Sequence, residues 1–106
     1  MNTEAQNIVK REARWTFCLA LYNWRDQGAI EPTFRAIANA MRFGLSDAEI
    51  REQLFYLKEK GLCTIEKNSV DGGLFALRTS ALIDVVEFSA PCPDGIARPA
   101  TKWWET

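Results

Sequence analysis

With 106 residues, 47% of them apolar, the chain is long enough for one compact domain with a real core and too short for two. Its 13 Lys and Arg residues are balanced by 14 Asp and Glu residues, so the net charge of −1 argues against the strongly basic surface typical of nucleic-acid-binding domains. Residues 1–45 carry a net charge of +2 and residues 46–106 one of −3, so any basic patch would draw mainly on the first half.

Several patterns with chemical meaning are missing from the sequence. There is no apolar run long enough to span a membrane and no signal-peptide pattern at the start, which predicts a cytoplasmic protein. Histidine is absent, and Cys18, Cys63 and Cys92 are widely separated, so we expect reduced thiols and no metal site or cofactor. Without a histidine base or a glycine-rich phosphate loop, an enzyme is not expected.

Residues 3–27 form the first predicted helix, because they contain no glycine or proline. Two apolar stripes run along nearly opposite sides of this helix, one made of Trp15, Cys18, Leu19 and Tyr22, the other of Ala13, Phe17, Ala20, Leu21 and Trp24. Leaving the large side chains of the second stripe in water would forgo on the order of 6 kcal/mol, so something is expected to cover it. The cover is either a second copy of the chain, which makes these five residues the interface of a homodimer, or the fourth helix or Trp103 and Trp104 folded back.

Gly28 ends the first helix, and "AIEP" is expected to be a short connector. Thr33 is the expected N-cap of a second helix over residues 34–42, with an inward face made of Phe34, Ile37, Ala38 and Met41. After the turn at residues 43–45, Ser46 and Glu49 have the spacing of a capping box at the start of a third helix. This helix turns Ile50, Leu54 and Leu57 inward and stops at Gly61.

A β-hairpin is predicted directly after the third helix. Residues 62–67 and 74–78 have strand patterns, and the Asp-Gly pair between them is a turn signal. Thr79 then caps a short fourth helix over residues 80–88, and the proline-containing residues 89–106 are expected to form an extended tail. The predicted fold is therefore mainly α with a β-hairpin, a winged helix-turn-helix domain over residues 1–88 followed by the tail.

Two stretches of the sequence resemble a family of small winged-helix proteins encoded by Mu-like bacteriophages and prophages. The first fits the family pattern S-x-x-x-[LI]-R-x-x-L-x-[WY]-L-x-E-x-G-L through Ser46, Ile50, Arg51, Leu54, Tyr56, Leu57, Glu59, Gly61 and Leu62. The second is similar to its closing P-G-[VI]-x-R-P signature, here lengthened by Asp94, through Pro93, Gly95, Ile96, Arg98 and Pro99, with Thr79, Asp84 and Val85 ahead of it. The resemblance implies a phage or prophage protein acting in the bacterial cytoplasm, and it carries no catalytic residue.

A winged helix normally reads DNA with its third helix and touches the backbone with the hairpin. Three of the five residues expected to face outward on this helix are carboxylates, whereas Arg51 is placed to make a bidentate guanine contact. The candidate contacts to double-stranded DNA are Arg35, Arg42, Ser46, Arg51, Phe55, Lys58, Lys67, Asn68 and Ser69. The expected function is DNA binding or transcriptional regulation by a homodimer.

The alternative is a module that binds a phage or host protein instead of DNA. Its working surface would be the acidic third helix, with Phe55 and Tyr56 exposed, together with the aromatic tail. Binding to DNA at low salt separates the two hypotheses.

Overall fold

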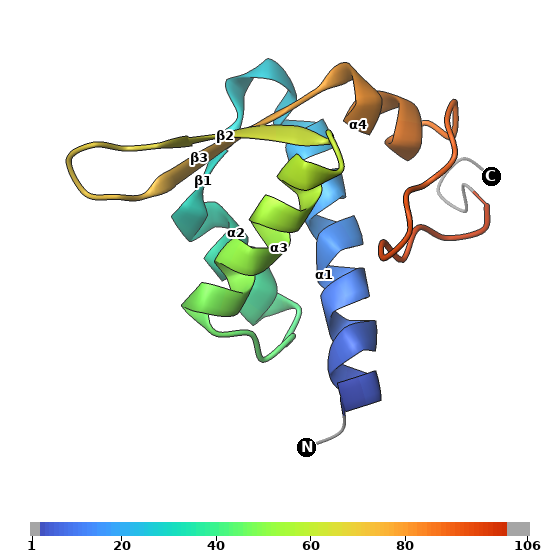
Figure 1. The fold of residues 1–106 in the computed structure, drawn as a ribbon, viewed down its shortest axis with the longest axis horizontal. Coiled ribbons are helices and arrows are strands. Elements are labelled where there is room, and N and C mark those ends of the chain that lie inside the picture. Colours follow the sequence, from blue (N-terminus) through green and yellow to red (C-terminus); the bar gives the residue numbers. More distant parts are fainter. Residues whose placement is uncertain (1–2, 102–106) are drawn as a thin grey trace.

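The computed structural model describes residues 3–101 and is mainly helical, with a small three-stranded antiparallel sheet (Figure 1). The predicted helices and both hairpin strands are present with nearly the expected bounds. In chain order the elements are α1 (Thr3–Trp24), the short 3₁₀ helix η1 (Arg25–Gln27), β1 (Ala29–Ile30), α2 (Glu31–Ala40), α3 (Asp47–Glu59), β2 (Cys63–Lys67), β3 (Leu74–Arg78) and α4 (Ser80–Val86).

The sheet has one strand more than the sequence predicted. β1 pairs antiparallel with β3, Ala29 opposite Ala76 and Ile30 opposite Phe75, which gives the strand order β1-β3-β2. Sequence reading took these two residues for a connector, since a two-residue strand has no periodicity of its own. The extra strand ties the segment between α1 and α2 to the hairpin, which extends away from the helices (Figure 1).

The start of α2 also differs from the prediction. The helix begins at Glu31, with Ile30 as N-cap and proline in the first turn, so the expectation that Thr33 caps it is wrong. Proline fits this position because its missing N–H would have no helical partner in the first turn. Phe34 and Ala38 are buried as expected, but Met41 lies beyond the end of the helix and is exposed.

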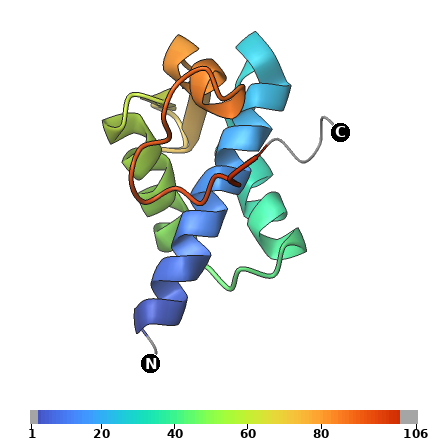
Figure 2. The ribbon, with the colours of Figure 1, turned by 90° about the vertical axis from the view of Figure 1, so that its right-hand side faces the viewer.

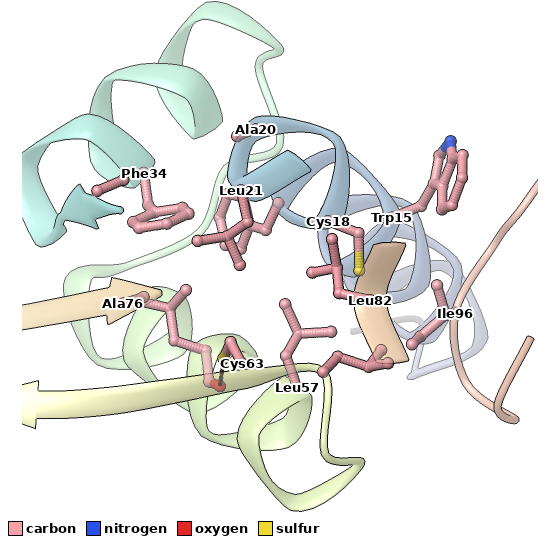
Figure 3. Packing of buried hydrophobic residues seen from close by; sticks show 14 of the residues in the cluster. Trp15, Cys18, Ala20, Leu21, Phe34, Leu57, Cys63, Ala76, Leu82 and Ile96 are labelled. Carbon is pink, nitrogen blue, oxygen red and sulfur yellow. Dashed lines mark hydrogen bonds between the residues drawn. The ribbon is translucent and has the colours of Figure 1, made fainter. Parts of the chain in front are cut away.

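Both apolar sides of α1 are covered within the single chain (Figure 3). On one side the Phe17 ring packs edge-on against Phe34 of α2, with 5.1 Å between ring centroids. On the other, Trp15 and Cys18 lie beside Ile96 of the tail and Leu82 of α4. The prediction that a partner chain covers the second stripe is therefore wrong for Ala13, Phe17, Ala20 and Leu21, which are buried, and of this stripe only Trp24 is exposed.

The segment after α4 has no regular secondary structure but is packed against the helices. Figure 2 shows it crossing α1 from the side of α3. The hydroxyl of Tyr56 donates to the Asp94 carbonyl at 2.7 Å, Arg14 donates to the Gly95 carbonyl at 2.9 Å, and the Ala97 N–H donates to the Arg11 carbonyl at 3.1 Å. This docked segment, residues 89–101, is part of the fold, and the predicted roles of Trp103 and Trp104 fall outside the described residues.

Candidate nucleic-acid interface

Local hydrogen bonds fix both ends of α3. The Glu49 N–H donates to the Ser46 hydroxyl at 3.1 Å and the Ser46 N–H donates to the Glu49 carboxylate at 3.0 Å, which confirms the predicted capping box. At the other end Gly61 has φ +77°, and Leu62 and Gly61 donate to the carbonyls of Leu57 and Lys58. These two bonds form a Schellman motif, so the helix stops where the hairpin must begin.

One stripe of α3 contains Arg51, whose Nη2 donates to the Gly72 carbonyl of the hairpin turn at 3.0 Å. Asp47, Arg51, Phe55 and Lys58 follow one another at helical spacing in this stripe. Ile50, Leu54 and Leu57 face the core as predicted, and a fourth buried residue, Gln53, joins them. We call the stripe and the residues of the hairpin turn, 67–72, the α3–hairpin face.

Arg51 is bound to a buried carboxylate. Its Nε and Nη2 donate to the two oxygens of Glu31 at 2.7 and 2.8 Å, and Nη2 also donates to the Gly72 carbonyl at 3.0 Å. Glu31 is only 4% exposed and also accepts from the Leu74 N–H at 3.2 Å. The hydrogen bonds from Arg51 hold the pKa of Glu31 below its usual value, and Glu31 raises the pKa of Arg51 in turn. This clamp joins the start of α2, the middle of α3 and the hairpin.

The clamp changes the predicted role of Arg51. A bidentate contact to guanine uses two neighbouring N–H groups of the guanidinium. In Arg51 the N–H groups of Nε and Nη2 already donate to Glu31 and Gly72, so this pair is not available to a base. Arg35 is engaged in a similar way, because its Nε donates to Asp47 at 2.9 Å and its Nη2 lies 3.6 Å from Glu31. In the structure these two residues hold the face together, and they are not the free phosphate or base contacts that the sequence predicted.

The other predicted contacts remain on the surface. Arg42 is exposed at the turn before α3, Ser46 is occupied as the cap of α3, and Lys58 lies over the ring of Phe55 at 5.9 Å. Phe55 itself is 43% exposed. At the hairpin turn Lys67, Asn68 and Ser69 are exposed, and the Asn68 side chain accepts from the Val70 N–H.

Several residues that hold α3 in place were not assigned this role from the sequence. Glu31 was read as part of a connector, although an acidic residue beside a proline is a usual helix start. Gln53 accepts from Arg14 at 2.8 Å and donates to the Glu49 carbonyl at 2.9 Å, and Arg14 stacks on Tyr56 with its guanidinium carbon 3.7 Å from the ring centroid. Tyr56, which the alternative hypothesis expected to be exposed, is partly buried and docks residues 89–101, a pairing that no local sequence signal could show.

The thiols lie away from this face. Cys18 and Cys63 are buried, Cys92 is partly buried, and all three are free. Burial raises the pKa of the Cys63 thiol to about 12 and raises that of Cys18 as well. Within residues 3–101 no group of three or more acidic or cysteine side chains is arranged to hold a metal ion.

No known protein family, curated protein or solved structure matches this chain. In the part of the chain that the structure describes, no helix is both long and apolar enough to cross a bilayer.

Proposed function

We propose that the chain is a phage-encoded winged helix-turn-helix protein that binds double-stranded DNA through the α3–hairpin face. The element order, the β1-β3-β2 sheet and a hairpin directly after α3 support the proposal. In helix-turn-helix proteins the second helix of the motif lies in the major groove, and here that helix is α3. The single observation that carries the proposal is that Phe55 and Lys58 are exposed on α3, and that a hairpin projecting from the body of the molecule follows this helix (Figure 1).

Phosphate contacts dominate the proposed binding. Three exposed cationic groups make no hydrogen bond or ion pair with a described residue: those of Lys58 and Lys67 on the face, and that of Arg42 outside it, in the turn that leads into α3. Contacts of this kind position a protein on DNA but do not read its sequence. Because Arg51 is held by Glu31, the proposed binding depends little on base sequence.

Three phosphate contacts give a definite salt dependence. The logarithm of the affinity is expected to fall with the logarithm of the salt concentration with a slope of roughly −2.7, so the affinity falls about 40-fold between 50 and 200 mM salt. Such binding is weak at physiological ionic strength. Homodimerisation is not part of this proposal, because the stripe that suggested it is buried within one chain.

The test is a fluorescence-anisotropy titration of a random-sequence duplex at several salt concentrations. Lys58→Ala/Lys67→Ala is expected to weaken binding and to reduce the slope to roughly −1, since one of three contacts remains. Arg11→Ala/Arg25→Ala removes the same charge from α1 and η1, and it is expected to leave the slope unchanged. Equal effects of the two double variants would contradict the proposed face.

A second function is favoured by one observation on the same surface. Glu52 and Glu59 are exposed on α3 next to the half-exposed Phe55, and this acidic and aromatic surface suits a basic protein partner better than a phosphate backbone. If the duplex does not bind at low salt, this protein-interaction module replaces the DNA proposal.

A further inference from the structure

A cavity of about 340 Å³ lies where the end of α1, η1, β3 and α4 meet. α3 and the hairpin turn contribute no lining residue, so the cavity is separate from the α3–hairpin face. It is lined by Tyr22, Asn23, Arg25, Arg78, Ile83 and Glu87. Its size is at the lower end of the range for small-molecule sites.

Arg78 brings to this cavity a positive charge whose partners are a backbone carbonyl, an exposed carboxylate and the ring of Tyr22, which lies 5.6 Å from the guanidinium carbon. Its side chain is only 15% exposed, and its Nη1 donates to the Tyr22 carbonyl at 3.0 Å. Its Nε is buried and has no acceptor among the described residues. Nη2 lies 3.8 Å from Asp26, a side chain that is 97% exposed and therefore screened by water. A largely buried guanidinium with this few acceptors favours an anion nearby.

Arg25 supplies a second guanidinium to the same cavity. It is exposed and has φ +55°, a left-handed conformation that is unfavourable for a residue with a side chain. Arg42 and Phe88, which follow the ends of α2 and α4, have the same conformation, so at Arg25 it marks the end of α1. The second guanidinium in the lining and the unsatisfied Arg78 Nε are independent observations at one cavity.

The carboxylate of Glu87 is already occupied within the cavity. The Tyr22 hydroxyl donates to it at 2.5 Å, and this hydrogen bond raises the pKa of Tyr22. The residues that line the cavity carry the two guanidinium groups of Arg25 and Arg78 and the single carboxylate of Glu87, a net charge of +1 that suits one anionic group and not a polyanion. The amide of Asn23 adds a neutral donor to the lining.

We infer that this cavity binds the oxyanion of a small molecule, a phosphate monoester or a carboxylate, between Arg25 and Arg78. Guanidinium groups pair with both anions through two parallel N–H donors. The inference is independent of DNA binding, because it uses none of the residues on the α3–hairpin face.

The test titrates the full chain with inorganic phosphate and, separately, with acetate, and follows the arginine Nε–H signals by ¹H–¹⁵N NMR. A saturable shift of the Arg78 signal is expected with at least one of the two anions. The anion that reaches saturation at the lower concentration shows whether the cavity prefers a phosphate or a carboxylate. Arg25→Ala is expected to weaken the affinity about tenfold, since it removes a charge-assisted contact. Lys67→Ala, a loss of the same charge on the hairpin, is expected to leave it unchanged.

Arg25 is exposed, so its replacement leaves the core intact and the test does not depend on a variant of the largely buried Arg78. A shift that does not saturate with either anion would overturn the inference, as would equal affinities of Arg25→Ala and the parent chain.

Discussion

The Arg51 side chain is held by the protein itself. It makes two hydrogen bonds to buried Glu31 and a third to the Gly72 carbonyl, and about three-fifths of the side chain is screened from water, since 38% remains exposed. The Glu31 carboxylate would lose its main partner if the arginine moved to a base. We therefore assign Arg51 the role of fixing the hairpin against α2 and α3.

Replacement of Arg51 by lysine keeps the positive charge but removes the paired N–H donors that bind both oxygens of Glu31. Arg51→Lys is expected to destabilise the fold by about 1–3 kcal/mol, the cost of leaving part of a buried carboxylate without its partner. Urea unfolding measures this value. Arg42→Lys, the same substitution at an exposed arginine that makes no ion pair with a described residue, is the control and is expected to cost at most about 0.5 kcal/mol. Equal losses of unfolding free energy for the two variants would contradict the role assigned to the Glu31–Arg51 pair.

The docked segment at residues 89–101 depends on Gly95. This residue has φ +84°, and a Cβ atom there would meet the Tyr56 hydroxyl and the Arg14 guanidinium. The closing signature that the sequence analysis singled out has a physical role here, because Gly95 allows the close approach, Ile96 is buried, and Arg98 donates to the Val85 and Ala90 carbonyls.

Gly95→Ala is expected to lower the free energy of unfolding by about 1–3 kcal/mol, because it combines backbone strain with a steric clash. Gly44→Ala is a matched control, since Gly44 has φ +69° but no atom within 4 Å of the added Cβ. Gly44→Ala therefore tests the backbone strain without the steric clash, and it is expected to lower the free energy of unfolding by about 1 kcal/mol. Thermal or urea unfolding measures both values. Equal decreases in the free energy of unfolding for Gly95→Ala and Gly44→Ala would contradict the docking role of Gly95.

The elements that the sequence predicted well are those specified by local signals. The capping box at Ser46, the stop at Gly61 and the hairpin strands each depend on residues close together in the chain. β1 was missed because its pairing with β3 joins residues more than forty positions apart. The Glu31–Arg51 clamp was missed for the same reason, since helical spacing shows which way Arg51 points but not what lies there.

In the molecule as a whole, α1 acts as a central helix with cover on both apolar sides. α2 lies on one side, and α4 with the docked segment lies on the other (Figures 1 and 2). Periodicity identified both stripes correctly but could not show that a chain of this length supplies both covers. Trp24 is the one member of the second stripe that remains exposed.

The covered stripe predicts how the chain behaves in solution. Sedimentation equilibrium at micromolar concentration is expected to give the mass of one chain, because Phe17 and Leu21 have no surface left to bury against a partner. Trp24→Glu is expected to leave that mass unchanged. A mass of two chains that this variant halves would show that Trp24 anchors a homodimer.

The proposed DNA face is tested most directly by mapping the duplex onto the protein. In a ¹H–¹⁵N NMR titration with random-sequence duplex at low salt, we expect the amide shifts to concentrate at Arg42, at the exposed side of α3 near Lys58, and at residues 67–69. The amides around Tyr22 and Arg78 are expected to remain unchanged, because the cavity they line lies outside the face. Shifts that avoid α3 and the hairpin, or no shifts at low salt, would contradict DNA binding through this face.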